Sequence, residues 1–388
     1  MKRPIEYYKY PIVTAIAFLV VGFYALVTFN LSFMGPVARA LKSIQMTDVY
    51  YQISQGTSDP DSSHLVTLVD MTELIERRDL AEALEDIMSL SPKAVGVDMI
   101  FQGLKADTLG DEMIRMVAES YDNITFSYEL MAFDANNQKY TDVRSSFFAP
   151  TPEYPLQGFT NMPRRDLYDD MKRVVAVGRN LNDTIVPSFI TQVVNTYTGE
   201  ETVKLSEKNI NINFHPMRFP TINAKEVLEH PELIEDRVVL FGAMKDAVDR
   251  HYTPLGKIPG VELLAYSVQT VVDQKEIKSL PQWLMWVISF LLTMFTHWWT
   301  QGWIEYQNRV RKNPFARVFM TSLMVIGFLR FLWMAVLTGI GYLLFNFFDL
   351  SVNFGWAFSA ICFLTTGQGF YNVLVAKHNE EKKVNVTK

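Results

Sequence analysis

The sequence predicts an α/β domain with a mainly parallel sheet, joined to α-helical transmembrane segments. The first observation is that apolar and polar residues are segregated along the chain. All seven tryptophans of the 388-residue chain lie from Trp283 onward, and most other apolar excess lies in residues 11–34 and near the C-terminus. The second is that short β-branched runs alternate with amphipathic helical patterns between residues 64 and 272, which is typical of βαβ units. A simple soluble enzyme is therefore excluded.

Four apolar stretches are long enough to cross a bilayer, which takes about 20 apolar residues in a helix. They cover residues 11–31, 280–303, 331–348 and 350–376. No charged residue lies between Lys9 and Arg39, so the first stretch exceeds the apolar core of a signal peptide and is predicted to be a retained anchor. The alternative is cleavage after the triplet 38–40, whose Ala-Arg-Ala sequence has the small-x-small pattern of a signal peptidase site.

The distribution of Lys and Arg predicts the orientation, because the cytoplasmic flanks of membrane spans carry a positive excess. The segments before the first span, between the second and third, and after the fourth together carry a net charge of +7, whereas residues 32–280 carry −13. With four spans, both termini are expected in the cytoplasm and the acidic segment in the periplasm. Arg330 is expected to snorkel to the cytoplasmic interface, with an intramembrane contact to another subunit as the alternative.

These patterns divide the chain into four parts. Residues 1–31 form a cytoplasmic tail and a membrane helix, 32–280 a periplasmic domain, 281–376 a three-helix membrane region, and 377–388 a short cytoplasmic tail. The single cysteine, Cys362, lies in the fourth apolar stretch, so residues 32–280 hold no disulfide. A disulfide-free domain of about 250 residues outside the bacterial inner membrane suits the periplasm. Its negative charge excludes nucleic acid as a partner.

Within residues 32–280 the elements follow in the order that βαβ units require. Apolar, β-branched runs predict strands at residues 64–70, 94–101, 124–128, 174–177, 210–214 and 237–242. Apolar positions at helical spacing predict helices at residues 78–90, 111–120 and 260–272. A further helix at residues 187–198 is expected to carry its proline in the first turn, and a short helix starts at residue 226. Four prolines predict loops between residues 132 and 165.

Acidic side chains follow the predicted strands. Asp70 ends the first strand, Asp98 lies in or at the end of the second, and Asp249 lies in the loop after residues 237–242. Since ligands of parallel sheets bind beyond the carboxyl ends of the strands, we expect these acids, with His251 and Arg78, to form one ligand-binding pocket. Two carboxylates on adjacent strands repel unless a cation or a proton intervenes. The alternative is that Asp70 and Asp98 each serve the structure, as a cap or as an acceptor of backbone N–H groups.

The run RVVLFGAMKDAVDRHYTPLGKIPGVELLAYSVQTVV, residues 237–272, resembles the closing motif of the CHASE2 family (cyclase/histidine-kinase-associated sensory domain, type two) of bacterial extracellular sensory domains. In that family a strand ending in glycine leads to an aspartate, a Thr-Pro-Leu-Gly turn, a Pro-Gly-Val-Glu helix start and then the membrane. The sequence supplies Gly242, Asp249, the turn from Thr253 and the helix start from Pro259. Upstream, LVTLVD and AVGVDMIF resemble the two family strands that end in aspartate, and NINFHPMRFP resembles the family's Asn-Phe segment.

The resemblance extends over residues 32–280 and implies a periplasmic sensory domain. It adds Thr253 to the candidate ligand-binding residues, while turn geometry is the alternative role of its segment. The arginine segment of the family, rich in tryptophan and proline, is not seen after the first strand, where Arg77 or Arg78 is the nearest counterpart. The family's usual cytoplasmic effector, a cyclase or a kinase, is not seen after the last span.

No phosphate-binding loop, dinucleotide fingerprint, zincin or serine hydrolase motif occurs, so neither an enzyme activity nor a cofactor is expected. The leading interpretation is a membrane receptor or adaptor that detects an envelope signal, such as a small molecule or peptide in the periplasm, and passes it across the lipid bilayer to a separate effector protein. One alternative is a structural docking subunit of an envelope complex that has no ligand. The other is a metal-dependent periplasmic hydrolase with Asp70 and Asp98 on a Mg²⁺ ion.

Overall fold

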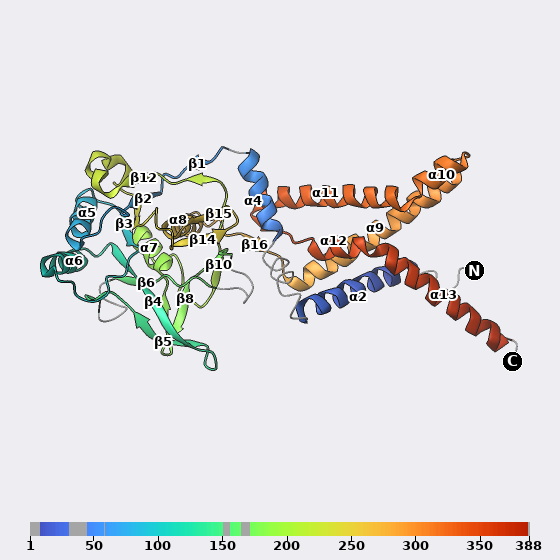
Figure 1. Ribbon diagram of the computed structural model, residues 1–388, viewed down its shortest axis with the longest axis horizontal. Coiled ribbons are helices and arrows are strands. Elements are labelled where there is room, and N and C mark those ends of the chain that lie inside the picture. The colour runs from blue at the N-terminus through green and yellow to red at the C-terminus, as the bar shows by residue number, and fades with distance from the viewer. Residues whose placement is uncertain (1–7, 31–44, 58, 150–155, 164–170, 387–388) are drawn as a thin grey trace. The chain divides into compact units, whose positions relative to one another are not determined.

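A computed structural model describes residues 8–30, 45–57, 59–149, 156–163 and 171–386 (Figure 1). The chain divides into two compact units: residues 51–277, here called the α/β domain, and residues 1–50 with 278–388, here called the helical unit. Helix α4 (Met46–Thr57) contains the boundary between them. The candidate cleavage site at residues 38–40 lies outside the described residues.

One mixed sheet forms the centre of the α/β domain. Its strand order is β12-β2-β13-β3-β4-β5-β8-β9, and β6 also pairs with β4. All neighbours from β12 to β4 are parallel, whereas the β4–β5 and β8–β9 pairs are antiparallel hairpins. The expected mainly parallel sheet is therefore confirmed. The strands are β2 (Val66–Asp70), β3 (Ala94–Val97), β4 (Ile124–Asp134), β5 (Lys139–Arg144), β6 (Gln157–Phe159), β8 (Gly178–Leu181), β9 (Thr184–Pro187), β12 (Thr221–Asn223) and β13 (Val238–Gly242).

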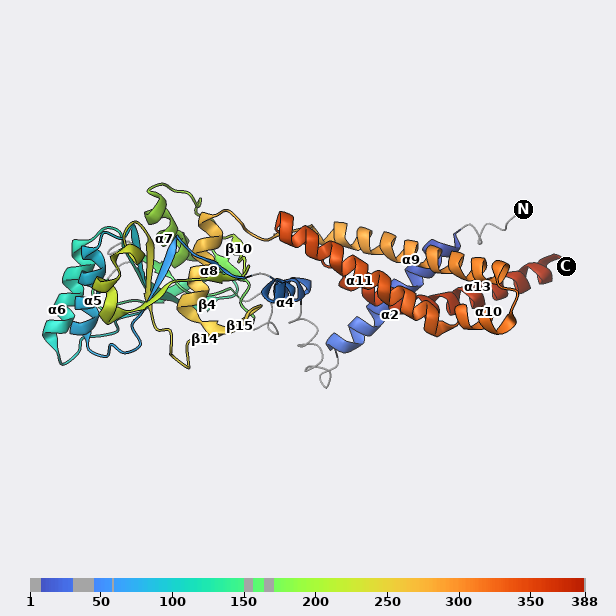
Figure 2. The ribbon, with the colours of Figure 1, turned by 90° about the horizontal axis from the view of Figure 1, so that it is seen from above.

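Helices cover both faces of the parallel strands. On one face, α5 (Arg77–Ser89) and α6 (Thr108–Ser120) lie side by side (Figure 1, Figure 2) and pack on alternate strand residues such as Val95 and Val97. On the other face lie α7 (Phe189–Thr198) and α8 (Gly260–Val272), where a Cβ added to Gly96 would stand 2.7 Å from the Phe189 ring. Because both faces are covered, β2, β3 and β13 are buried at every position, as the continuous apolar runs predict.

Several element ends differ from the sequence prediction. The strand expected at residues 94–101 ends at Val97. Pro187 ends β9 rather than opening a helix, because Ser188 is the N-cap of α7 and its hydroxyl accepts from the Thr191 N–H at 3.2 Å. The interval expected to be loops contains β5 and β6. The strand expected at residues 210–214 is shorter, as β10 (Asn209–Asn211), and pairs with β7 (Val174–Ala176).

Smaller elements complete the α/β domain. The hairpin of β14 (Arg250–Thr253) and β15 (Gly256–Pro259) leads directly into α8. The remaining elements are β1 (Asp61–Ser62), which pairs with β11 (Met217–Arg218), and the 3₁₀ helices η2 (Ala224–Glu229) and η3 (Pro231–Leu233).

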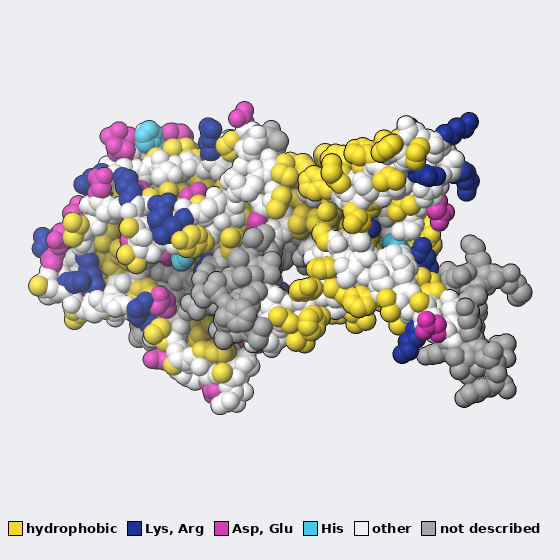
Figure 3. All heavy atoms as spheres, turned by 45° about the vertical axis from the view of Figure 1, so that its right-hand side comes forward, with side chains coloured by type: hydrophobic (Ala, Val, Ile, Leu, Met, Phe, Trp, Pro, Cys, Tyr) yellow, Lys and Arg dark blue, Asp and Glu magenta, His cyan; other side chains and the backbone are white. Residues whose placement is uncertain are grey.

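The helical unit holds the apolar helices. They are α2 (Lys9–Asn30), α9 (Gln282–Val310), α10 (Pro314–Met320), α11 (Leu323–Phe348), α12 (Gly355–Cys362) and α13 (Leu364–Val386), with a short pairing of β16 (Lys278–Ser279) and β17 (Leu350–Ser351). Figure 3 shows hydrophobic side chains over the visible face of this unit and Lys and Arg side chains near one end of it. Arg309, Arg311, Lys312 and Arg317, at the end of α9 and in α10 and the link between them, are exposed.

The expected number of four spans is not confirmed. By length and composition, two helices of the described residues can cross a membrane, α2 and α11, and a third span results if α12 and α13, which meet at a 55° bend, count as one. Helix α9 is long enough at 29 residues but falls short in composition. The reason is a polar stripe: Thr293, Thr296, His297 and Thr300 are buried on one face of α9.

Arg330 does not snorkel to a surface. Its side chain is buried within the helical unit, where the guanidinium Nη1 donates to Thr365 Oγ1 at 3.0 Å. The partner found thus belongs to the same chain, whereas the alternative drawn from the sequence was a contact with another subunit.

A first prediction concerns the contact between β6 and α7. A Cβ added to Gly158 would lie 2.3 Å from the Phe189 Cα, and the backbone cannot move away as a side chain can. We expect Gly158→Ala to destabilise the α/β domain by about 1–3 kcal/mol or more, the usual range for overpacking. Chemical unfolding of the full chain in detergent measures this. Gly56→Ala is the control, because the added Cβ meets nothing within 4 Å. An unchanged stability of the Gly158 variant would contradict the described packing.

Candidate functional site

Asp98 stands at the carboxyl end of β3, next to β13. Its backbone N–H donates to the Phe241 carbonyl at 2.9 Å, which continues the pairing of the two strands by one residue. A Cβ added to Gly242 would lie 3.4 Å from the Asp98 Cβ and 2.8 Å from Val261, so the end of β13 has no room for a side chain. Among the described residues, the Asp98 carboxyl group makes no hydrogen bond. This is the edge of the sheet where ligands of parallel sheets bind.

Asp249 and His251 come to the same place from the segment that precedes α8. The Asp249 Oδ1 lies 3.1 Å from His251 Nε2, and the Asp249 carbonyl accepts from the Gly260 N–H at 3.1 Å. Gly260 is required by this close approach, because a Cβ there would stand 2.4 Å from the Asp249 Oδ2. The β14–β15 hairpin sets His251 opposite Ile258 and so fixes the imidazole at the start of the helix.

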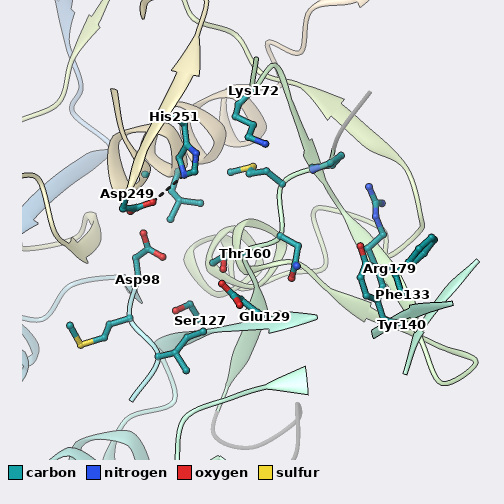
Figure 4. Close-up of a pocket in the computed structure, with 17 residues that line it drawn as sticks. Asp98, Ser127, Glu129, Phe133, Tyr140, Thr160, Lys172, Arg179, Asp249 and His251 are labelled. Carbon is teal, nitrogen blue, oxygen red and sulfur yellow. Dashed lines mark ion pairs between the residues drawn. The ribbon is translucent and has the colours of Figure 1, made fainter. Parts of the chain in front are cut away.

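These three side chains form one wall of a cavity of about 740 Å³ (Figure 4). Figure 4 shows the Asp98 carboxyl group turned toward Asp249, with Ser127 and Glu129 below, Thr160 in the middle and Arg179 on the opposite side. The cavity is polar and lies within the α/β domain. The lining residues are Asp98, Met99, Ile100, Ser127, Glu129, Phe133, Tyr140, Thr160, Asn161, Met162, Pro163, Lys172, Arg179, Asp249, His251, Gly260 and Leu264.

The Asp98 carboxyl group holds its proton more tightly than an isolated aspartate does. Burial, and then the negative charge of Asp249, raise the pKa of Asp98 to about 7, while His251 opposes the rise. At neutral pH the acidic wall is thus poised between a protonated and an ionised form of Asp98. A cation that entered the cavity would favour the ionised form.

The opposite wall carries positive charge and an aromatic pair. Phe133 of β4 and Tyr140 of β5 are cross-strand neighbours, with ring centroids 5.0 Å apart. Arg179 of β8 donates to the Gly178 and Glu207 carbonyls and, at 2.6 Å, to Asn209 Oδ1. Among the described residues no carboxylate pairs with this guanidinium, whose pKa burial lowers.

The structure does not bring Asp70 to the cavity. The Asp70 Oδ1 accepts from the backbone N–H groups of Thr72 at 3.0 Å and Met244 at 3.1 Å, and from the Thr72 hydroxyl. Burial acts to raise the pKa of Asp70, but these hydrogen bonds and Lys245 outweigh it and the pKa is lowered. Of the two roles that the sequence allowed for Asp70, ligand binding and structural support, the structure therefore shows the second. The acid that lies near Asp98 is Asp249 and not Asp70.

Arg78 and Thr253 also lie outside the cavity lining. Arg78 forms a two-pronged ion pair with Asp107, with both N–O distances at 2.7 Å, on the exposed side of α5. The Thr253 hydroxyl donates to the Gly256 carbonyl at 2.9 Å and accepts from the Leu255 N–H, which closes the turn between β14 and β15. Each has a structural contact that accounts for it.

Sequence reasoning missed the lower and opposite walls. Ser127 and Glu129 alternate with the apolar residues Phe126, Tyr128 and Leu130 along β4, and two polar residues two positions apart in an apolar strand are a signal of a polar face. Arg179 gave no such signal, because β8 reaches the cavity only through the hairpin topology. No group of three or more His, Cys, Asp or Glu side chains in the described part of the chain could hold a metal ion, and Asp70 and Asp98 do not converge on one.

The α/β domain holds a polar cavity of ligand size, and the helical unit contains two helices, α2 and α11, that are long and apolar enough to cross a membrane. The chain belongs to the CHASE2 domain family, whose sequence model matches residues 16–300. This match confirms the resemblance found in the sequence. CHASE2 domains are extracellular sensory domains. No curated protein and no solved structure shows significant similarity to the chain.

A second prediction concerns the ionisation of Asp98. Because the folded-state pKa lies near 7 and the unfolded one near its ordinary value, ionisation of Asp98 costs stability that grows from about pH 4 to pH 7 and is complete above. Asp98→Asn should leave stability unchanged near pH 4 and raise it near pH 8 by an amount on the order of 1–3 kcal/mol. Unfolding midpoints of the full chain at the two pH values measure the effect.

Two other acids serve as controls for that prediction. Asp246→Asn removes an exposed acid of the same loop and should give no pH-dependent gain. Asp70→Asn should destabilise at pH 8 by about 1–3 kcal/mol, because two backbone donors lose their carboxylate. If Asp98→Asn destabilised the chain equally at both pH values, the raised pKa of Asp98 would be contradicted.

Proposed function

We propose that the protein is a membrane-anchored receptor or adaptor whose α/β domain detects a signal in the bacterial periplasm and passes it to a separate partner protein. The observation that carries the proposal is the CHASE2 match over a domain that holds a polar cavity of ligand size. The apolar helices α2 and α11 supply the anchoring. The described residues offer no metal cluster that favours the hydrolase alternative.

The proposed topology places the α/β domain outside the cytoplasm and both termini inside. The charge asymmetry of −13 against +7 supports this orientation. It requires that α9 also crosses the bilayer, which its length of about 44 Å allows. No charged residue of α9 precedes Glu305, its polar stripe is turned inward, and Leu291, Phe295 and Trp298 are exposed on its outer side.

A third prediction tests this topology. A phosphatase that is active only in the periplasm should be inactive when fused after Lys388 or inserted between Lys312 and Asn313, because both sites lie in positively charged segments. The same enzyme inserted after Ala135, in the exposed turn between β4 and β5, should be active. Activity at the site after Lys312 would show that α9 does not cross, and the four-span topology would be wrong.

The segment after α8 is one of the two covalent connections between the α/β domain and the helical unit, and α4 contains the other. The Asn211 amide donates to the Ile277 carbonyl at 2.8 Å, and the Asn213 amide donates to the Lys275 carbonyl at 3.0 Å. These bonds fasten residues 275–277 to the domain. A rearrangement within the domain therefore reaches Lys278 directly, and the proline N-cap of α9 follows three residues later.

A fourth prediction tests signal transfer along this route. Three glycines inserted between Ile277 and Lys278 leave the bonds of Asn211 and Asn213 intact but add a flexible joint, which transmits neither rotation nor displacement. We expect the variant to be inserted and folded and to fail in complementing a strain that lacks the protein. Three glycines between Glu200 and Glu201, in an exposed loop, are the control and should complement. If both insertions complement, the docking-subunit alternative is the better account.

A further inference from the structure

The cavity has Asp98 and Asp249 on one wall and Arg179 on the opposite one, with Lys172 also in its lining near His251 (Figure 4). Among the described residues, neither the Asp98 carboxyl group nor the Arg179 guanidinium forms a direct ion pair. On one side the Asp98 carboxyl group has no hydrogen-bond partner, and Asp249 shares only its Oδ1 with His251. On the other side the Arg179 guanidinium binds only uncharged oxygen atoms. Glu129 adds no net charge to either, because its cross-strand partner Arg144 pairs with it.

A ligand of a single charge does not match such a cavity. An anion would suit Arg179 but would meet two carboxyl groups on the other wall. A cation would suit Asp98 and Asp249 but would leave the partly buried Arg179 without a direct ion pair, since Glu207 acts on it without forming one. A molecule with a cationic and an anionic end satisfies both walls, since each charged hydrogen bond then replaces a contact with water.

The volume of the cavity and the residues between its charged walls indicate the size of the ligand and the chemistry of its middle part. A volume of about 740 Å³ is in the range of cavities that enclose molecules larger than one small amino acid. Between the charged walls lie Ser127 and Thr160, which can donate or accept hydrogen bonds, and the rings of Phe133 and Tyr140. Phe133 is 51% exposed, so a bound ligand would cover apolar surface that water now contacts.

We propose that the cavity binds a small zwitterion of short-peptide size, with its ammonium group between Asp98 and Asp249 and its carboxylate at Arg179. The proposal rests on the sensory function proposed above and names the chemical class of the signal. The ammonium group donates to the two carboxyl groups, and Gly260 keeps the approach open because it has no side chain. Ser127 and Thr160 bind the polar groups in the middle of the ligand.

Calorimetric titration of the full chain in detergent tests the proposal, with alanyl-alanine and trialanine as probes at pH 8. At least one of the two should bind. N-acetyl-trialanine lacks the ammonium group and trialanine amide lacks the carboxylate, and each should bind about tenfold or more weakly than trialanine or not at all. Absence of binding by both peptides, or equal binding of the blocked analogues, would overturn the proposal.

Two variants assign the ends of the ligand. Asp98→Asn should weaken binding of the zwitterion about tenfold and leave any binding of N-acetyl-trialanine unchanged. Arg179→Gln should likewise weaken binding of the zwitterion about tenfold and leave any binding of trialanine amide unchanged. Asp246→Asn, outside the cavity, should bind as the wild type does, and thermal unfolding checks that each variant is folded. Binding that neither Asp98 nor Arg179 variants weaken would place the ligand elsewhere and contradict the proposal.

The result of the peptide-binding test can be distinguished from the result of the test of the proposed function. If the peptides fail to bind while the insertion at Ile277 still abolishes complementation, the receptor function stands with a ligand of another class. If the peptides bind as expected while the insertion variant complements fully, the cavity is a zwitterion site in a protein that does not transmit a signal through that joint.

Discussion

The proximity of two carboxyl groups at the end of the parallel strands is the constraint on which the site depends. Asp98 is placed there by β3 and Asp249 by the turn before α8, and two like charges in a partly buried position cannot both ionise without cost. Three features of the surroundings accommodate the two carboxyl groups. His251 takes one Asp249 oxygen, Gly242 and Gly260 leave room, and the cavity admits water or a ligand on the open side.

The sequence predicted the parallel core because local and global signals agree there. Continuous apolar runs are buried on both faces, and the one-sided apolar pattern of α5 and α6 matches the face that each buries. The antiparallel extension was not predictable in the same way. The β8–β9 hairpin is short and half exposed, and its turn is made by Asn182 and Asp183 with positive φ angles, a sequence that also suits a loop.

Asp70 and Asp98 show that the role of an acid at a strand end cannot be predicted from its local sequence alone. Each follows a buried strand, and the sequence gives both the same prediction. Their roles differ because the Met244 N–H, which comes from 174 residues further along the chain, reaches Asp70, and because Thr72 adds a second donor. Asp98 has no such donors and faces Asp249 instead. In the helical unit the same limit applies to α9, whose buried polar stripe lowers its hydropathy although the helix is long and carries no charge before Glu305.

The most direct test of this account is the titration of Asp98 itself. Carboxyl carbon-13 NMR of the full chain, labelled at aspartate and assigned with the Asp98→Asn variant, would follow its protonation. The account predicts a pKa of about 7 in the wild type. In Asp249→Asn it predicts a lower pKa that still lies above the ordinary value for aspartate, because burial persists. A wild-type Asp98 that titrates at the ordinary value, or one that does not respond to the loss of Asp249, would contradict the shared acidic wall.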